Sequence, residues 1–166
     1  HEVLVRTVAC GVCHSDLHFK LGAMQQFPVP AVLGHEAAGI VEKVGAGVTG
    51  FKPGDHVIAC NSIACGTCHR CISGEPHLCM NRAPARRPRG ARPRLSQDGN
   101  KLLAFSDLGA MSQYMLLSER ALVRIDKDIP LDRAALLGCA VLTGVGAALN
   151  TAKIKPGSSV AVFGCG

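Results

Sequence analysis

The chain has 166 residues, of which 48% are apolar and 18% charged. A chain of this length can bury roughly 70% of its unfolded surface. This composition excludes intrinsic disorder, and 19 glycines without a sequence repeat exclude collagen and coiled coils. The net charge is +6, from 18 Lys and Arg against 12 Asp and Glu.

The first 60 residues predict short strands around one helix. Glu2–Cys10 alternates in a β-rich pattern and predicts a strand. His14–Gly22 predicts a short helix that Ser15 or Asp16 can cap and that the glycine ends. Residues 37–60 predict two more strands, divided by glycines and a proline. Strands at this spacing are typical of a small antiparallel barrel or sandwich.

A metal-binding lobe follows, because four cysteines are separated by gaps of two, two and seven residues: Cys65, Cys68, Cys71 and Cys79. A gap of two residues lets successive thiolates face one ion, and four thiolates complete a tetrahedral zinc shell. Such a shell leaves no coordination position for substrate. The spacing therefore predicts a structural zinc site rather than disulfides or unrelated thiols.

The excess charge lies in the stretch Arg82–Arg94, which holds six arginines and no acid, so the rest of the chain balances at 12 against 12. Arg, Pro and Ala dominate the stretch, and we expect an exposed loop that does not pack. Arginine clusters also neutralise phosphates, so a zinc-containing nucleic-acid-binding module is an alternative function. The stretch lacks an aromatic platform for bases, and we expect no nucleic-acid partner.

The last third predicts two strands, at 112–118 and 121–125, and then helical structure over 130–152 with a break around Gly138. Ala134–Ala152 carries no charge and approaches the length of a membrane span. Its glycines, threonines and Asn150 favour a buried helix pair instead. We therefore expect no membrane partner.

The C-terminal residues predict the start of a dinucleotide-binding unit. An apolar strand over 159–163 is followed by Gly164, Cys165 and Gly166, which match the opening of the G-x-G-x-x-G motif. A glycine turn after any parallel strand is the alternative. Because the chain opens without methionine and stops directly after an apolar run, we expect both ends to be cut. A cytoplasmic location is also expected.

Three isolated residues gain meaning from the motifs around them: Cys13, His35 and Cys139. Singly, each is as well explained by an ordinary buried thiol or hydrogen-bonded histidine. The chain resembles the zinc-dependent alcohol dehydrogenases of the medium-chain dehydrogenase/reductase family over nearly its whole length. The segments that carry the resemblance are GVCHSDLH, GHEAAGIVEKVG, GDHV, CGTCHRC with Cys79, LLGCAVLTG and VAVFGCG.

The resemblance implies that Cys13, His35 and Cys139 hold a catalytic zinc, which with the structural site makes two zinc ions per chain. Two thiolates and one imidazole leave a fourth position for water or substrate. The resemblance also implies a nicotinamide cofactor, NAD or NADP, with His14 beside its pyrophosphate and Thr143 beside its nicotinamide. Gly164 and Gly166 would bind the same cofactor.

Further catalytic roles are implied for four residues of the same motifs. Ser15 corresponds to the group that hydrogen-bonds the reacting oxygen, and His18 to the outer member of the proton relay. A helix cap and a surface side chain are their alternatives. Asp16 corresponds to the carboxylate that orients the zinc histidine, and Glu36 to a neighbour of the zinc. A buried acid paired with an arginine is the alternative for Glu36.

The expected architecture is a mainly β, GroES-like catalytic domain over residues 1–139, with the zinc lobe at 60–80. The start of an α/β Rossmann domain follows at 140–166. The expected activity of the full-length protein is oxidation of a small alcohol to an aldehyde or ketone, in a homodimer or homotetramer. A thiol-dependent formaldehyde dehydrogenase is the alternative enzyme. Cys60 and Asn61 stand where an aromatic residue often lines the family's substrate pocket, so a more polar substrate than a simple alcohol is expected.

Overall fold

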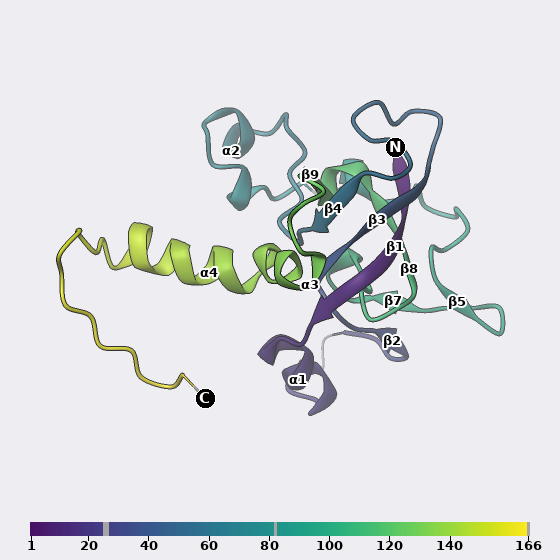
Figure 1. The fold of residues 1–166 in the computed structure, drawn as a ribbon. Helices are drawn as coiled ribbons and strands as arrows, with labels where there is room; N and C mark the ends of the chain where they lie inside the picture. The colour runs from purple at the N-terminus through teal and green to yellow at the C-terminus, as the bar shows by residue number, and fades with distance from the viewer. Residues whose placement is uncertain (25–26, 82, 166) are drawn as a thin grey trace.

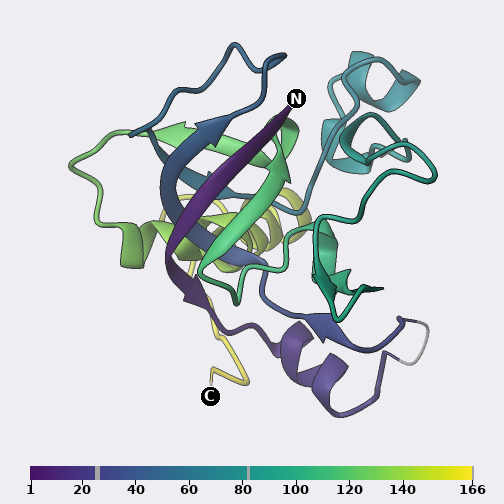
Figure 2. The same ribbon diagram turned by 90° about the vertical axis from the view of Figure 1, so that its right-hand side faces the viewer.

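The computed structural model describes residues 1–24, 27–81 and 83–165. Its centre is a five-stranded sheet in the order β8-β1-β3-β4-β9, in which all neighbours are antiparallel (Figures 1 and 2). The strands are β1 (Glu2–Gly11), β3 (Glu36–Val44), β4 (His56–Ala59), β8 (Tyr114–Ser118) and β9 (Leu122–Ile125). The antiparallel arrangement is confirmed, and so are the strands predicted before residue 126.

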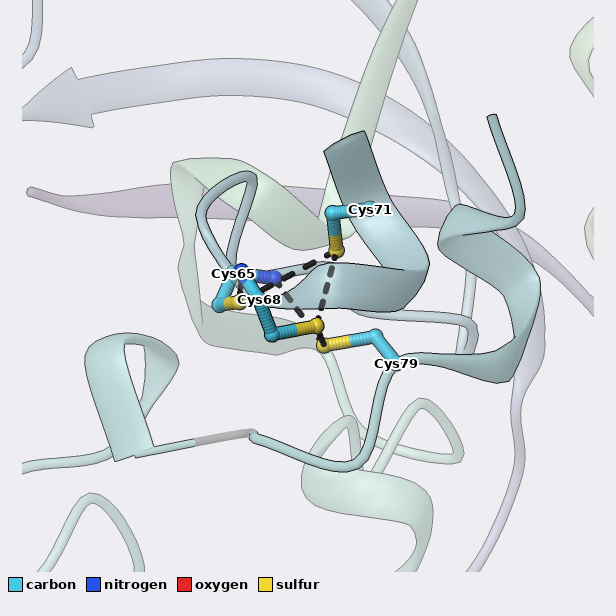
Figure 3. A group of neighbouring side chains, drawn as sticks. All are labelled: Cys65, Cys68, Cys71 and Cys79. Carbon is cyan, nitrogen blue, oxygen red and sulfur yellow. Dashed lines mark hydrogen bonds between the residues drawn. The ribbon is translucent and has the colours of Figure 1, made fainter. Parts of the chain in front are cut away.

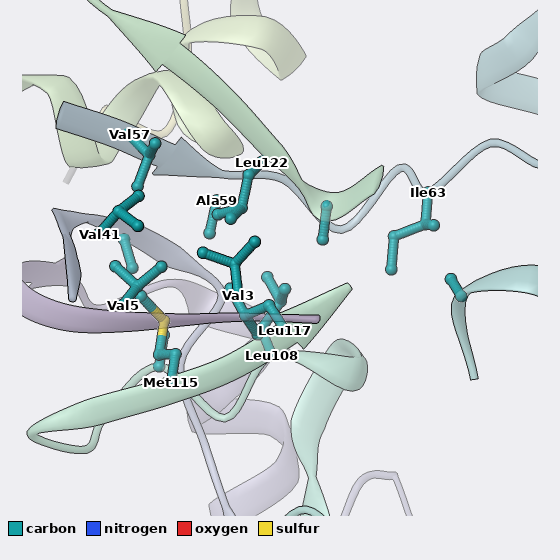
Figure 4. Packing of buried hydrophobic residues seen from close by; sticks show 14 residues of the cluster. Val3, Val5, Val41, Val57, Ala59, Ile63, Leu108, Met115, Leu117 and Leu122 are labelled. Atoms are coloured by element: carbon teal, nitrogen blue, oxygen red, sulfur yellow. The ribbon is translucent and has the colours of Figure 1, made fainter. Parts of the chain in front are cut away.

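Apolar residues alternate along β1, so one face of this strand is buried in the core. Val3 and Val5 are fully buried and pair with Leu117 and Met115 of β8, which are buried as well. Val57 of β4 joins them in the same core (Figure 4). Complete burial of an aliphatic side chain contributes about 1.5–3 kcal/mol, so this alternation fixes the register of the central strands.

The helix after β1 is α1 (His14–Lys20), and its cap differs from the prediction. The N-cap is Cys13, and Asp16 in the third helical position accepts a hydrogen bond from the Cys13 amide at 3.0 Å. This arrangement forms because an acid at this position can satisfy a donor that the helix leaves unpaired. Gly22, with a φ of +76°, follows the helix as expected. The capping contact also anchors Cys13.

Short elements connect the main strands. They are β2 (Ala31–Val32), which pairs in parallel with β7 (Leu103–Ala104), the hairpin β5 (Ser96–Gln97) and β6 (Asn100–Lys101), the helix α2 (His69–Ile72), and the single turns η1 (Pro76–Leu78), η2 (Ala83–Ala85), η3 (Phe105–Asp107) and η4 (Glu119–Ala121). The β2–β7 pair brings the loop before β3 beside the segment that follows the arginine stretch.

The arginine stretch is not simply an exposed loop, which corrects the prediction. Ala85 is buried in the main core. Glu2 of β1 accepts hydrogen bonds from Arg87 at 2.6–3.1 Å and from Arg94 at 2.6 Å. Arg82 lies outside the described residues. A carboxylate shared by two guanidinium groups offsets part of the mutual repulsion of the arginines, so both flanks of the loop are held against the sheet.

The predicted break in the helical segment is confirmed, but its second half is not buried. The segment consists of α3 (Leu131–Ala134), η5 (Ala135–Gly138), α4 (Ala140–Gly146) and η6 (Ala147–Thr151). Ala134 and Ala135 are buried, whereas Leu142 is 59% exposed and Leu149 60% exposed. The prediction of a buried pair fails because α4 extends away from the sheet and nothing in the described chain covers it (Figure 1).

Among the described residues, no single helix is long and apolar enough to cross a bilayer. The segments Leu131–Gly138 and Ala140–Thr151 meet the criterion only together, across a 52° bend.

The strand predicted at 159–163 does not form. These residues have no strand partner, and Val162 and Phe163 are 72% and 93% exposed. A strand requires neighbours that satisfy its backbone groups, and no other described segment lies beside this one.

Candidate metal centres

The four-cysteine lobe brings its sulfurs together. The ligand atoms of Cys65, Cys68, Cys71 and Cys79 all lie within 4.8 Å of one another. The Sγ of Cys68 lies 3.5 Å from that of Cys71 and 3.8 Å from that of Cys79 (Figure 3). Such a cluster of sulfurs matches the donor set of a structural zinc site.

Backbone amides of this lobe are directed at the sulfurs. The amides of Thr67 and Cys68 donate to the Sγ of Cys65 at 3.4 and 3.2 Å. The hydrogen bond from Thr67 is the main cause that lowers the pKa of Cys65 to about 6, whereas burial raises the pKa of Cys71 to about 11. A hydrogen bond with the Cys71 backbone also lowers the pKa of Cys68. The lobe thus favours the thiolates of Cys65 and Cys68 and disfavours that of Cys71, and a bound cation would favour ionisation of all of them.

A second cluster joins residues that are far apart in the sequence. One ligand atom each from Cys13, His35, Glu36 and Cys139 lies within 4.8 Å of the others. Cys13 is the N-cap of α1, the histidine and glutamate lie where β3 begins, and Cys139 lies at the break between η5 and α4. The fold therefore brings together the three residues for which the sequence predicted a catalytic zinc.

Two glycines beside the donors let the backbone reach these positions. Gly34 has a φ of +90°, and a Cβ there would lie 2.7 Å from the Met111 amide nitrogen. A Cβ on Gly138 would lie 2.3 Å from the Ala59 carbonyl oxygen. A side chain at either glycine would displace the neighbouring donor, His35 or Cys139, because both contacts are with backbone.

Asp16 lies behind the histidine. The residue is 3% exposed, and its carboxylate accepts hydrogen bonds from the amides of Cys13 at 3.0 Å and Gly34 at 2.9 Å. One of its oxygens lies 3.6 Å from the Nδ1 of His35, a nitrogen that has no hydrogen-bond partner among the described residues. This placement directs Nδ1 toward the carboxylate and leaves Nε2 as the metal-binding nitrogen, as in other carboxylate–histidine pairs.

The electrostatic environment of the second cluster favours a bound cation. Burial is the main cause that raises the pKa of Cys139 to about 11, and the neighbouring Cys13 and Glu36 raise it further. Two sulfurs and one imidazole form the donor set of a catalytic zinc site, in which three protein ligands leave the fourth position open. Binding of the ion would displace the thiol proton and neutralise the buried negative charge.

Glu36 lies beside these three donors. The sequence placed it beside the metal, with pairing to an arginine as the alternative. It is 3% exposed and has no arginine partner in the part of the chain that the structure describes. A Cβ on Gly11 would lie 2.8 Å from its Oε2, so the carboxylate packs closely against the β1 backbone. Its carboxylate thus lies beside the three expected zinc ligands, and the role of a zinc neighbour stays a prediction.

The other predicted site residues lie at different distances from the cluster. The Oγ of Ser15 is 3.7 Å from the Sγ of Cys13, and the Oγ1 of Thr143 is 3.9 Å from the Sγ of Cys139. His14 and His18 are exposed, with ring centroids 4.8 Å apart. The C-terminal Gly164 is exposed and is not part of the cluster, and Gly166 lies outside the described residues.

A cavity of about 340 Å³ adjoins the second cluster, and Ser15, His35 and Asn61 are part of its wall. Sequence reasoning missed Phe27 and Phe105, which also line it and whose ring centroids lie 5.9 Å apart. Both lie in short connecting segments without a motif. The cavity combines an aromatic wall with polar groups, as small-molecule sites commonly do.

Comparison with known proteins agrees with this geometry. Residues 1–127 match the family described as "Alcohol dehydrogenase GroES-like domain". The chain belongs to this alcohol dehydrogenase family. Its sheet is accordingly the GroES-like catalytic fold, and the zinc-dependent resemblance inferred from the motifs is confirmed.

Two curated members of the alcohol dehydrogenase family are similar over the whole chain. Alcohol dehydrogenase class-3 of Drosophila melanogaster is 44% identical, and the class-3 enzyme of Myxine glutinosa is 43% identical. Each alignment covers 100% of this chain and 45% of the relative. The chain thus spans less than half the length of these relatives.

Solved structures of the family have the same fold. An alcohol dehydrogenase zinc-binding domain protein from Burkholderia ambifaria aligns with a TM-score of 0.77 and 36% identity, over 95% of this chain and 44% of that one. Benzyl alcohol dehydrogenase from Acinetobacter calcoaceticus aligns with a TM-score of 0.74 and 38% identity, over 95% and 43%.

Proposed function

We propose that the complete protein is a zinc-dependent alcohol dehydrogenase, which oxidises an alcohol to an aldehyde or ketone and transfers hydride to NAD or NADP. The observation that carries the proposal is the donor cluster of Cys13, His35 and Cys139 beside a cavity. A closed four-sulfur site leaves no room for substrate, whereas this mixed cluster adjoins a space that can hold one.

Each chain would hold two zinc ions, one in the lobe and one in the mixed cluster. Zinc bound in the mixed cluster would supply a Lewis acid that favours deprotonation of an alcohol. Ser15 lines the cavity beside Cys13 and would accept the alcohol proton. His18 is exposed and would pass that proton to solvent. Asp16 would orient the imidazole of His35 throughout.

The cofactor contacts follow from the positions around the cluster. Thr143 lies beside Cys139 and would contact the nicotinamide, while His14 at the start of α1 would contact the pyrophosphate. Gly164 and Gly166 would belong to the glycine-rich turn of the same site. Hydride transfer itself depends on the cofactor, which these residues would position against the substrate.

The domain division at residue 139 is also part of the proposal. Residues 1–139 would form the catalytic domain, and 140–166 would begin a Rossmann domain. Leu142, Leu149 and Phe163 are highly exposed, and exposed apolar side chains of this size favour packing against another part of the protein. The part of the relatives that this chain does not span would provide that packing surface. It would also provide the neighbouring strands beside which residues 159–163 become a strand.

The expected partners are small alcohols and further copies of the same chain. A homo-oligomer in the cytoplasm, without nucleic-acid or membrane partners, remains our proposal. The shared pairing of Arg87 and Arg94 with Glu2 supports the absence of a nucleic-acid partner, because those two arginines already have an acidic partner.

A thiol-dependent formaldehyde dehydrogenase is the second candidate, and a specific cavity favours it. A space of about 520 Å³ is lined by five arginines and Lys101. Such a basic wall suits an anionic thiol adduct of formaldehyde. The names of the curated class-3 relatives do not separate the two candidates.

The experiment that tests both is a steady-state assay of the zinc-loaded full-length protein with NAD and with NADP. Cofactor reduction with simple alcohols supports the first candidate. Reduction only with formaldehyde plus an anionic thiol supports the second. Reduction with neither, in a protein that holds both zinc ions, contradicts the proposal.

A further inference from the structure

The cavity beside the mixed cluster adjoins the basic cavity. Arg86, Leu103, Ala104 and Asp107 line both spaces, so these four residues form their common boundary. Ser15 and His35 lie on the wall of the first space, and the arginine stretch forms most of the wall of the second. A substrate that reaches from one space into the other must pass this boundary.

The boundary carries an ion pair. The Nη2 of Arg86 lies 3.3 Å from the Oδ2 of Asp107, and the aspartate side chain is 27% exposed. Among the described residues that line either cavity, Asp107 is the only acid, whereas the basic cavity has five arginines and a lysine. A single acidic side chain therefore lies at the boundary of a cavity whose other charged lining residues are basic.

We propose that Asp107 is a specificity-determining residue, which holds Arg86 and restricts access of negatively charged alcohols to the basic cavity. This inference rests on the proposed alcohol dehydrogenase function. A carboxylate on the substrate would meet the like charge of Asp107 and would also compete with it for Arg86. Like charges at close range are a common device for rejecting a competing ligand.

The backbone at this position determines which substitution is informative. Ser106 and Asp107 have φ values of 58° and 62°, a region that asparagine tolerates better than most residues. Asp107→Asn therefore removes the charge at little cost in backbone strain. Asp98→Asn is the matched control, because Asp98 has a φ of 51°, is exposed and lines neither cavity.

The probes are benzyl alcohol and 4-(hydroxymethyl)benzoate, which differ only in one carboxylate. With the zinc-loaded full-length protein, we expect Asp107→Asn to raise the kcat/KM ratio of the charged over the neutral alcohol about tenfold. Asp98→Asn leaves the ratio at the wild-type value. Calorimetric titration with 4-(hydroxymethyl)benzoate measures the same preference without turnover, as an affinity about tenfold tighter in Asp107→Asn.

The outcomes separate this inference from the proposed function. If benzyl alcohol is oxidised but both the rate ratio and the affinity are equal in Asp107→Asn and Asp98→Asn, the inference is overturned and the proposed function stands. If no variant oxidises either alcohol but Asp107→Asn alone binds the carboxylate more tightly, the charge selection stands without the oxidation. Equal binding in all variants without oxidation overturns the inference as well.

Discussion

The two candidate metal centres are built in opposite ways. The donors of the lobe lie between Cys65 and Cys79, so one short segment supplies all of them. The donors of the mixed cluster run from Cys13 to Cys139 and come together only when β1, β3 and η5 pack. The four-cysteine site can therefore stabilise the conformation of one loop. The mixed cluster, which depends on the whole fold, would place a metal beside the cavity.

The largest expected effect separates the two centres by function. In the full-length protein, Cys139→Ala should lower kcat/KM by about 10³-fold, because the mixed cluster loses a ligand and with it the Lewis acid. Cys68→Ala should mainly lower the thermal unfolding temperature. Each variant should lose one zinc ion by metal analysis. Equal losses of activity and of unfolding temperature in the two variants would contradict this division of roles.

A smaller effect is expected behind the histidine. Asp16→Asn should weaken zinc binding to the mixed cluster about 10–100-fold, because the amide can accept only through one atom while the carboxylate now receives two backbone N–H groups. Competition with a chelator measures the affinity. Asp132→Asn is the matched control, since Asp132 also lies in a first helical turn but is exposed. An affinity unchanged by Asp16→Asn argues against the orienting role.

The sequence predicted the local features of this comparison best. The spacing of the four cysteines and the alternation along β1 are patterns within short segments. The first predicts the sulfur cluster and the second predicts the strand, and the structure contains both. The convergence of Cys13, His35 and Cys139 depends on sheet pairing, which spacing cannot reveal, and it entered only through the family resemblance. Residues 159–163 have the pattern of a strand but lack the neighbours that would make them one.

The residues that line the cavity could not be predicted from the sequence either. Phe27, Phe105 and Asp107 lie in segments without periodicity or motif, and the parallel pairing of β2 with β7 places those segments together. The packing of Ala85 and the pairing of Arg87 and Arg94 with Glu2 were likewise hidden by a composition that is typical of solvated loops.

The smallest expected effect concerns Glu2. Hydrogen bonds from Arg87, with those from Arg94, lower the pKa of Glu2 from 4.5 to about 2. Because the folded-state pKa is the lower one, the stabilisation is complete above about pH 4.5 and is lost as the pH falls toward 2. After allowance for solvent screening, about 1 kcal/mol is expected.

Urea unfolding at pH 6 and at pH 3 measures this effect. Relative to wild type, Glu2→Gln should lower the free energy of unfolding by about 1 kcal/mol at pH 6 and by less at pH 3. Glu42→Gln removes a surface pair with Arg6 and serves as the control. A deficit in Glu2→Gln that is the same at both pH values would show that the ionised pair contributes nothing specific.

The most direct test of the two-centre account is zinc K-edge X-ray absorption on the zinc-loaded full-length protein, combined with metal analysis. The account predicts two zinc ions per chain and an average first shell of three sulfur and one nitrogen or oxygen, from one four-sulfur site and one site with two sulfurs. Cys139→Ala should then leave one ion with an all-sulfur shell. A wild-type protein with a single zinc in an all-sulfur shell would contradict the account.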